Sequence, residues 1–273
     1  IPVISINKLK NEENNFAIDE IIVSRPNETI ESKKEIFKSF ENLKVNIKFF
    51  DSLTAHLKSS SLENFQKLAV ESIFKKKDYS KNLSEKLFNG KTILITGAGG
   101  SIGSELCKQI LYLNPKRIIV LDHSEINLYA ILNELQTIKI FKNLSSEIID
   151  ILATVKDSNR IDKVFEKYKP NFIYHTAAYK HVPMMEKNII EAISNNIIGT
   201  LNVARSSIKY NSEKFIFVST DKAVRPTNIM GASKRAAEIY IQDMSGANHN
   251  TIFAIVRFGN VFGSSGSVVP LFY

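Results

Sequence analysis

A glycine-rich stretch near the middle of the chain constrains the fold more than any other part of the sequence. Residues 92–96 are short, apolar and β-branched, which predicts a buried strand, and residues 104–113 predict a helix. Between them Gly97, Gly100 and Gly103 recur at every third position. A helix N-terminus binds anions through its free N–H groups, and glycine lets a pyrophosphate approach the backbone closely. The stretch therefore predicts a dinucleotide site, although an ordinary strand-to-helix turn would also need small residues.

Strands and helices alternate through the rest of the chain, which predicts an α/β fold with a Rossmann-type, doubly wound parallel sheet. We expect strands at 92–96, 117–121, 148–153, 171–176, 215–219 and 251–257, separated by helices at 104–113, 125–135, 157–168, 189–210 and 233–246. In such a sheet ligands bind at the carboxyl ends of the strands.

A smaller α/β unit is expected to precede this sheet. Strands at 1–6, 20–24 and 44–50 and an amphipathic helix at 29–43 suggest a β-α-β order, but no glycine-rich turn accompanies them. The predicted domains are therefore a partial Rossmann-like α/β unit at 1–55, a helical linker at 56–84, and an NAD-binding catalytic domain at 85–273. The lysine run 75–77 is interpreted as a solvated face of the linker.

Composition narrows the function classes. The net charge is +8, but the lysines are scattered, so a nucleic-acid partner is weakly indicated and a nucleotide phosphate suits the basic surface as well. The single cysteine, Cys107, rules out an internal disulfide and fits a reducing compartment. The histidines show no metal-ligand spacing, so no metal is expected. The chain starts with Ile1 and stops in an apolar segment, so we interpret it as a soluble piece of a longer protein.

An acidic residue follows the glycine turn at the distance expected of a ribose ligand. Asp122 stands at the end of the second predicted strand, 19 residues after Gly103. Its carboxylate would accept hydrogen bonds from a free 2′-hydroxyl and repel a 2′-phosphate, which predicts NAD, with NADP less favoured. Asp122 could also serve as a helix cap.

A second polar group follows the predicted strand 215–219. Asp221 and Lys222 place a carboxylate beside an amine, and Lys234 lies on the next helix four residues after Met230. A neighbouring acid and base suit proton transfer, and a plain surface turn is the less favoured interpretation. Met230 cannot exchange a proton, so either the site is inactive or another group handles the alcohol proton.

Several motifs together resemble the membrane-associated nucleoside-diphosphate-sugar 4,6-dehydratases of bacterial polysaccharide and glycan biosynthesis, within the extended short-chain dehydrogenase/reductase superfamily. They cover about 85–270. The matching stretches are Gly97-Ala-Gly-Gly-Ser-Ile-Gly-Ser-Glu105, Asp122-His-Ser-Glu125, Ala177-Ala-Tyr-Lys-His-Val-Pro183 with Glu186, Asn196-Ile-Ile-Gly-Thr200, Ser219-Thr-Asp-Lys222, Met230-Gly-Ala-Ser-Lys234, Arg257-Phe-Gly-Asn-Val261 with Gly263, and Gly266-Ser-Val268.

The resemblance implies NAD-dependent UDP-N-acetylglucosamine 4,6-dehydratase activity, with Met230 typical of the branch that retains configuration at C5. It implies a UDP-sugar substrate, a homo-oligomer, and a place on the cytoplasmic side of the bacterial inner membrane, held there by N-terminal helices that this chain lacks. The implied catalytic residues are Thr220, Asp221, Lys222, Met230 and Lys234. The implied cofactor-binding residues are Gly97, Gly100, Ser101, Ile102, Gly103, Asp122, Ala177, Ala178 and Lys234. The implied substrate-binding residues are Lys180, His181, Asn260, Ser267 and Val268.

The expected chemistry is oxidation at C4, loss of water across C5 and C6, and reduction at C6. Lys222 would remove the C5 proton and Asp221 would protonate the leaving hydroxyl. The C4 hydroxyl proton could go to Thr220, to water or to Asp221. Thr154 stands where relatives carry an adenine-contacting Asp, which leaves the adenine contact open. A 4-epimerase, or a non-catalytic NAD-binding regulator, is the alternative.

Overall fold

The computed structural model describes residues 20–24, 46–50, 85–247 and 249–259, and the chain divides into two compact units, Ile1–Lys77 and Asp78–Tyr273. In the first unit, β1 (Glu20–Ser24) pairs in parallel with β2 (Asn46–Phe50), as a β-α-β order requires. The other elements predicted for that unit, strand 1–6 and helix 29–43, and the linker 56–84 lie outside the described residues.

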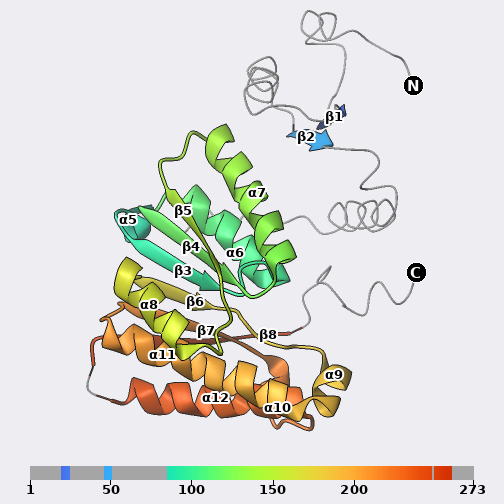
Figure 1. Ribbon diagram of the computed structural model, residues 1–273, viewed down its shortest axis with the longest axis vertical. Coiled ribbons are helices and arrows are strands. Elements are labelled where there is room, and N and C mark those ends of the chain that lie inside the picture. The colour runs from blue at the N-terminus through green and yellow to red at the C-terminus, as the bar shows by residue number, and fades with distance from the viewer. Residues whose placement is uncertain (1–19, 25–45, 51–84, 248, 260–273) are drawn as a thin grey trace, which may run out of the picture. The chain divides into compact units, whose positions relative to one another are not determined.

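The second unit is built on a six-stranded parallel sheet with the order β5-β4-β3-β6-β7-β8 (Figure 1). This order confirms the doubly wound fold predicted from the alternation of elements. The strands are β3 (Thr92–Thr96), β4 (Arg117–Asp122), β5 (Glu147–Leu152), β6 (Phe172–His175), β7 (Lys214–Thr220) and β8 (Ile252–Phe258).

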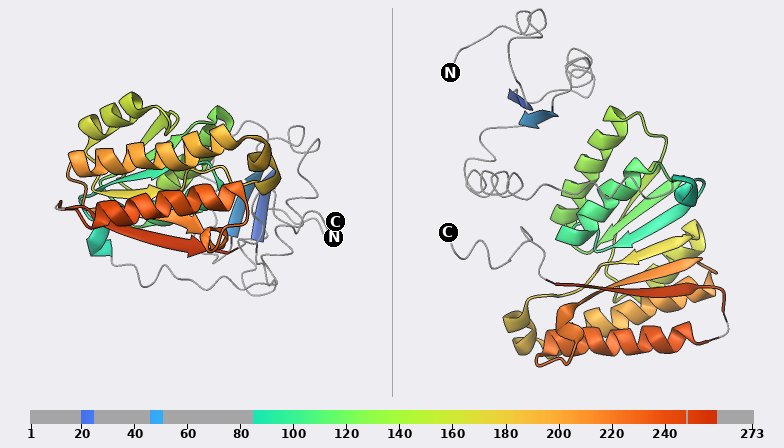
Figure 2. Two further views of the ribbon diagram at one scale, coloured as in Figure 1. Left: turned by 90° about the horizontal axis from the view of Figure 1, so that it is seen from below. Right: turned by 180° about the vertical axis from the view of Figure 1, so that it is seen from behind.

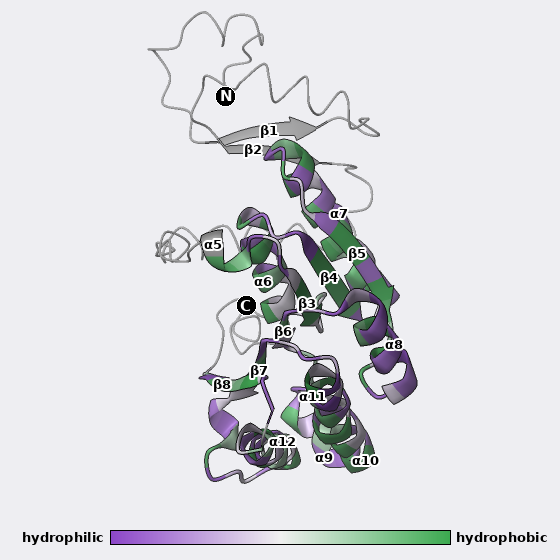
Figure 3. Cartoon of the chain, turned by 90° about the vertical axis from the view of Figure 1, so that its left-hand side faces the viewer, coloured by the Kyte–Doolittle hydropathy of each residue, from purple (hydrophilic) through white to green (hydrophobic). Residues whose placement is uncertain are grey.

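Helices cover both faces of the sheet (Figures 1 and 2). One face buries alternate strand residues such as Leu94, Ile119 and Phe217 against α8, α11 and α12, and the other buries Ile93 and Val120 against α5, α6 and α7. Alternation arises because successive strand side chains point to opposite faces. The helices mix hydrophilic and hydrophobic residues, as helices between a core and solvent do (Figure 3). Their bounds are α5 (Glu85–Phe88), α6 (Ser101–Tyr112), α7 (Glu125–Phe141), α8 (Ser158–Tyr168), α11 (Thr200–Lys209) and α12 (Ile229–Ser245).

The sheet reverses its winding between β3 and β6. The chain winds outward from β3 through β4 to β5 and then returns to add β6 on the other side of β3. A crevice therefore opens at the carboxyl ends of β3 and β6, which is where open α/β sheets bind their ligands.

Helix boundaries differ from the sequence prediction in three informative places. α6 begins at Ser101 rather than at residue 104. The sequence prediction began the helix after Gly103 because glycine has a low helix propensity, but in the structure Gly103 lies inside the first turn. α12 begins at Ile229, four residues early, where Asn228 caps it by accepting from Gly231 N–H. The single helix expected over 189–210 is divided into α10 (Ile189–Ala192), a π-helical segment (Ile193–Gly199) and α11. A short α9 (Val182–Lys187), which was not predicted, precedes them.

Among the described residues, no helix is both long and apolar enough to cross a membrane.

Candidate active site

The glycine turn joins β3 to α6 at the crevice. Gly97 has a φ of +68°, a left-handed conformation that favours glycine. A side chain on Gly103 would collide with the carbonyl oxygen of Gly97, so glycine lets the helix begin directly against the strand end. No side chain caps α6 at Gly100, and no acidic residue lies in its first turn. The first N–H groups of the helix therefore face the crevice without a competing carboxylate, which suits a pyrophosphate.

Asp122 lies next to this turn and is almost fully buried. Its Oδ2 accepts from Gly99 N–H at 2.9 Å and its Oδ1 accepts from Ser124 N–H at 2.9 Å. The predicted alternative role as helix cap belongs instead to Ser124, whose hydroxyl accepts from Asn127 N–H. A carboxylate has about four acceptor positions, and the His123 ring nitrogen also lies 3.4 Å from Oδ1. Asp122 is therefore held in place and keeps an acceptor position for a ribose hydroxyl.

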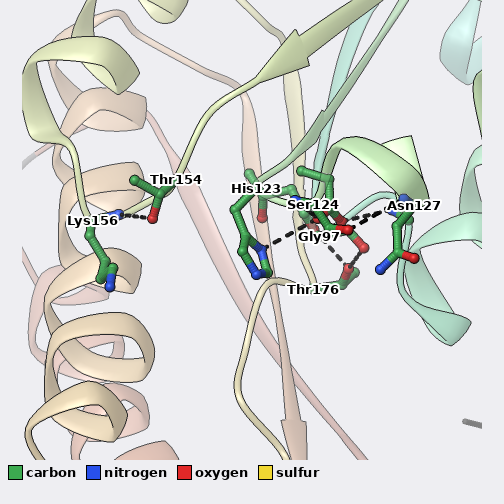
Figure 4. A network of polar contacts seen from close by, with 10 residues as sticks. Gly97, His123, Ser124, Asn127, Thr154, Lys156 and Thr176 are labelled. Atoms are coloured by element: carbon green, nitrogen blue, oxygen red, sulfur yellow. Dashed lines mark hydrogen bonds and ion pairs between the residues drawn. The ribbon is translucent and has the colours of Figure 1, made fainter. Parts of the chain in front are cut away.

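A cavity runs from the glycine turn past Asp122 to the end of β5. Figure 4 shows five of the residues that line it, Gly97, His123, Asn127, Thr154 and Thr176. Of the predicted cofactor residues, Gly97, Gly100, Asp122, Ala177 and Ala178 line it. The lining also includes residues that the sequence analysis did not assign to cofactor binding: Leu121, His123, Asn127, Ala153, Thr154, Val155, Thr176, Tyr179 and Asn195. Most of them could have been found as residues at or just after strand ends, since those ends converge on one crevice. Asn127 and Asn195 lie within helical segments and carry no such signal.

Thr154, at the position where the family resemblance leads us to expect an acidic residue, lines the cavity just after β5. Its hydroxyl oxygen accepts from Lys156 N–H at 3.3 Å, and its proton is available for a ligand. The Lys156 ammonium is paired with Glu191 at 2.8 Å. A neutral hydroxyl thus takes the place of the expected carboxylate.

Lys234, the cofactor residue predicted on α12, does not line this cavity. Its side chain is 4% exposed, and its Nζ has no hydrogen-bond partner among the described residues. The ammonium stands 4.1 Å from the centre of the Phe217 ring. Burial lowers the pKa of Lys234 to about 7, and the nearby Glu238 carboxylate acts in the opposite direction. A buried cation without an acceptor is costly unless a ligand supplies one, and ribose hydroxyls are suitable acceptors.

A buried hydrogen-bond network runs from the strand before the glycine turn to α12, the helix that carries Lys234. The Thr200 hydroxyl donates to Asn196 O, so its oxygen accepts from His175 Nε2–H at 2.9 Å. The bare Nδ1 of His175 then accepts from the Thr96 hydroxyl at 2.7 Å. Burial and, to a smaller extent, the charge of Lys234 lower the pKa of His175 to about 3, so the ring is neutral.

Asn196 extends this network to the loop after β6. Its side chain accepts from Tyr179 N–H, and its Nδ2 donates to Tyr179 O and to the hydroxyl of Ser233 on α12. Asn196 therefore fixes the Tyr179 backbone, which lines the cavity, against the helix that carries Lys234. The sequence analysis quoted Asn196 within a motif but gave it no role.

The predicted acid–base pair lies where β7 ends. Asp221 and Lys222 are in a single 3-10 turn (Asp221–Ala223), and Lys222 Nζ is 3.2 Å from Asp221 Oδ1. The Thr220 hydroxyl donates to the same oxygen at 3.0 Å and accepts from Lys222 N–H. Hydrogen bonds from Thr220 and then Lys222 lower the pKa of Asp221. With no ligand bound, Asp221 is therefore a carboxylate.

Met230 is buried at the start of α12. It packs with Met185 and Ala192, against Tyr179 and Val182. The side chain that stands in place of a phenol is thus part of a small apolar cluster beside the site.

Lys180 and His181 follow β6 and are exposed, and partial burial lowers the pKa of Lys180. His181 is the N-cap residue of α9, but its side chain makes no capping hydrogen bond. Asn260, Ser267 and Val268 lie outside the described residues.

Comparisons with known proteins agree with this architecture. Residues 93–273 match the family described as polysaccharide biosynthesis protein. The capsular polysaccharide biosynthesis protein CapD of Staphylococcus aureus is 44% identical over 94% of this chain and 43% of its own length. An inverting UDP-N-acetylglucosamine 4,6-dehydratase of Campylobacter jejuni is 37% identical over 68% of this chain and 54% of its own length. The chain thus spans about half or less of these relatives.

Solved structures share the fold. Pen from Bacillus thuringiensis is 35% identical, with a TM-score of 0.62 over 68% of this chain and 57% of that chain. WbmG of Bordetella bronchiseptica, solved with NAD, is 22% identical with a TM-score of 0.51 over 62% of this chain and 53% of that chain, a likeness that shows the fold alone. The sheet order, the glycine turn and the match over residues 93–273 together establish that this chain belongs to the polysaccharide biosynthesis protein family.

Proposed function

We propose that this protein is an NAD-dependent nucleotide-sugar 4,6-dehydratase that acts on UDP-N-acetylglucosamine. The observation that carries the proposal is the place of the Asp221–Lys222 pair, in a turn packed against α12, the helix that carries the unpartnered ammonium of Lys234. The site thus combines a binding group for a dinucleotide with an acid and a base for elimination. The dehydratase from C. jejuni supports the reaction type.

NAD is the proposed cofactor, and its chemistry is to accept hydride from C4 and return hydride to C6. The first turn of α6 would bind the pyrophosphate, Asp122 the adenosine ribose, and Lys234 the ribose of the nicotinamide. WbmG, which shares the fold, was solved with NAD. The described residues thus offer one group for each of these three parts of the cofactor.

A proton must move from Lys222 to Asp221 before the two groups can act as base and acid. In the open site they form an ion pair, whereas elimination needs a neutral amine as base and a protonated carboxyl as acid. A bound sugar that excludes water raises the cost of two charges and favours transfer of the proton from Lys222 to Asp221. One proton transfer thus produces both catalytic forms.

The elimination then follows from these two groups. The Lys222 amine takes the C5 proton of the 4-keto sugar, and the Asp221 carboxyl gives its proton to the C6 hydroxyl, which leaves as water. After C6 is reduced, Lys222 returns the proton to C5, which leaves a neutral Lys222 amine beside the Asp221 carboxylate. The proton that the C4 hydroxyl gives up on oxidation restores the Lys222 ammonium, so the ion pair is regenerated. The product is a UDP-4-keto-6-deoxy-N-acetylhexosamine, and the net change is loss of one water.

The test is incubation of the protein and NAD with UDP-N-acetylglucosamine, followed by mass spectrometry. We expect a product lighter by one water. A product of unchanged mass with inverted C4 would instead identify a 4-epimerase, the activity named for relatives from Rickettsia bellii. No conversion, with NAD still bound, would favour a non-catalytic regulator.

Cofactor choice provides an independent check. Because Asp122 is fixed by two backbone N–H groups, it cannot swing away from a 2′-phosphate. We expect the nucleotide-free protein to bind NAD at least tenfold more tightly than NADP in calorimetric titrations. Equal affinity, or a preference for NADP, would contradict the ribose-binding role of Asp122.

A further inference from the structure

Glu238 is a buried carboxylate to which the proposed function gives no role. It lies on α12, one helical turn after Lys234, and its side chain has no exposed surface. Arg257 on β8 donates from Nε to Oε1 at 2.8 Å and from Nη2 to Oε2 at 2.6 Å, and Arg235 donates to Oε2 at 3.0 Å. Bidentate pairs of this kind are among the stronger hydrogen bonds in proteins. Although burial raises the pKa of Glu238, hydrogen bonds from Arg257 and Arg235 bring it to about 2, so the group is a carboxylate at neutral pH.

The charge of Glu238 affects the protonation of Lys234 because the other groups around Lys234 contribute little net charge. From β6, His175 faces Lys234 and is neutral. Phe217 on β7 places an uncharged ring against the Lys234 ammonium. The turn of Asp221 and Lys222 also packs against α12, and its two charges cancel. Glu238 is paired with Arg257 and Arg235, so its carboxylate offsets two guanidinium charges close to Lys234 and favours the ammonium.

We propose that Glu238 is a positioning residue of the cofactor site, which acts on the bound dinucleotide by keeping the buried side chain of Lys234 charged. This inference rests on the proposed cofactor NAD. Without the carboxylate, Lys234, Arg235 and Arg257 would be three cations close together, and the buried amine of Lys234 would release its proton. A neutral amine has one donor fewer and no charge to attract ribose oxygens.

Glu238 could instead matter only because it holds β8. Arg257 lies two residues before Gly259, where an added Cβ would lie 3.8 Å from Asp221 Oδ2, so the ion pair also anchors the end of β8 near the catalytic turn. Removal of Arg257 breaks this anchor but leaves the carboxylate. The two roles can therefore be separated by variants on the two sides of the ion pair.

The experiment measures NAD affinity of the nucleotide-free protein from pH 5.5 to 8.5 by calorimetry. The wild-type affinity should fall above about pH 7, as Lys234 loses its proton. In Glu238→Gln the fall should begin at lower pH, so that the loss relative to wild type is less than twofold at pH 5.5 and about tenfold at pH 8. Arg257→Gln should show no such pH-dependent loss, because one positive charge near Lys234 has been removed. Circular dichroism would check that each variant is folded.

A control carboxylate lies at the amino ends of the strands. Unlike Glu238, which is buried and paired with two arginines, Glu213 is partly exposed and accepts from Lys91 Nζ at 2.6 Å and from Asn171 Nδ2 at 2.9 Å. Glu213→Gln should leave NAD affinity unchanged at every pH.

Three outcomes are decisive. A Glu238→Gln variant that follows the wild-type profile overturns the inference, as does an Arg257→Gln variant that loses affinity with rising pH more steeply than wild type. The second comparison still decides if Glu238→Gln fails to fold. A wild-type protein that binds no NAD at any pH would refute the proposed cofactor instead.

Discussion

At the scale of single residues, the site depends on groups whose charge is set by their surroundings. Asp221 is held as a carboxylate by Thr220 and Lys222, whereas burial pushes Lys234 toward neutrality. Each group is thus prepared to change its charge when a ligand excludes water or supplies a hydrogen-bond partner.

The acid–base pair should be essential for the reaction and dispensable for folding. We expect Asp221→Asn and Lys222→Ala each to reduce dehydration of UDP-N-acetylglucosamine by at least about 100-fold, the usual contribution of general acid–base catalysis. Both side chains lie at the surface of the turn, so thermal unfolding should change little. The exposed pair Asp162 and Lys209, 2.7 Å apart, offers the matched control, and Asp162→Asn and Lys209→Ala should keep full activity. Near-normal turnover by either site variant would remove the assignment.

Replacement of Met230 by tyrosine should not raise the dehydratase activity. Its side chain is 4% exposed and packs with Met185 and Ala192, so Met230→Tyr would overfill the cluster at a cost of about 1–3 kcal/mol. We expect unchanged or lower dehydratase activity in Met230→Tyr, wild-type activity in the volume-matched Met230→Leu, and weaker NAD retention in Lys234→Ala. A several-fold gain in Met230→Tyr would show that position 230 is a damaged catalytic position.

At the scale of elements, the cofactor site depends on how closely α6 meets β3. Gly103 allows that approach, because a side chain there would collide with the carbonyl oxygen of Gly97 and would lie 2.8 Å from the Thr176 hydroxyl. The start of the helix, and hence its anion-binding end, is placed by this contact.

Gly103→Ala should therefore push α6 away from the strand. We expect NAD affinity to fall at least tenfold and the free energy of unfolding to fall by about 1–3 kcal/mol, measured by calorimetry and urea denaturation. Gly246→Ala is the control, since a Cβ there meets nothing closer than 3.5 Å and stability should change by no more than about 0.5 kcal/mol. Equal effects of the two substitutions would contradict the importance of this contact.

At the scale of the whole molecule, the stability of the sheet is coupled to pH through His175. The ring is fully buried between Thr96 and Thr200, and its pKa is about 3 in the folded protein against an ordinary value of 6.5. The unfolded chain therefore binds a proton that the folded protein does not between these two values. Stability is full above pH 6.5 and declines as the pH falls toward 3.

We expect the free energy of unfolding to fall by about 1.4 kcal/mol per pH unit between pH 6 and 4.5 through this one group. Urea denaturation of wild type and His175→Gln at several pH values would check it. The variant should be less stable at pH 7 but show a shallower slope over that range. Parallel slopes would mean that other groups dominate the acid response.

The sequence alone determined the fold class, because β-branched runs alternate with amphipathic helices and the glycine turn admits few folds. It also determined which residues follow strand ends, and Asp122, Asp221 and Lys222 all lie there in the structure. These are local properties: strand period, turn chemistry and spacing in the chain.

Only the tertiary structure decided which distant groups meet and what charge they carry. Asn196 is 17 residues from Tyr179 and 37 from Ser233 but bonds to both, and Arg257 reaches Glu238 across 19 residues. The π-helical segment 193–199 interrupts a helix that the sequence pattern made continuous. Burial of His175, Lys234 and Glu238 depends on packing of the whole sheet, and burial together with hydrogen bonding sets the charge of each. Such desolvation has no signature in spacing along the chain, because it arises only when remote segments together exclude water.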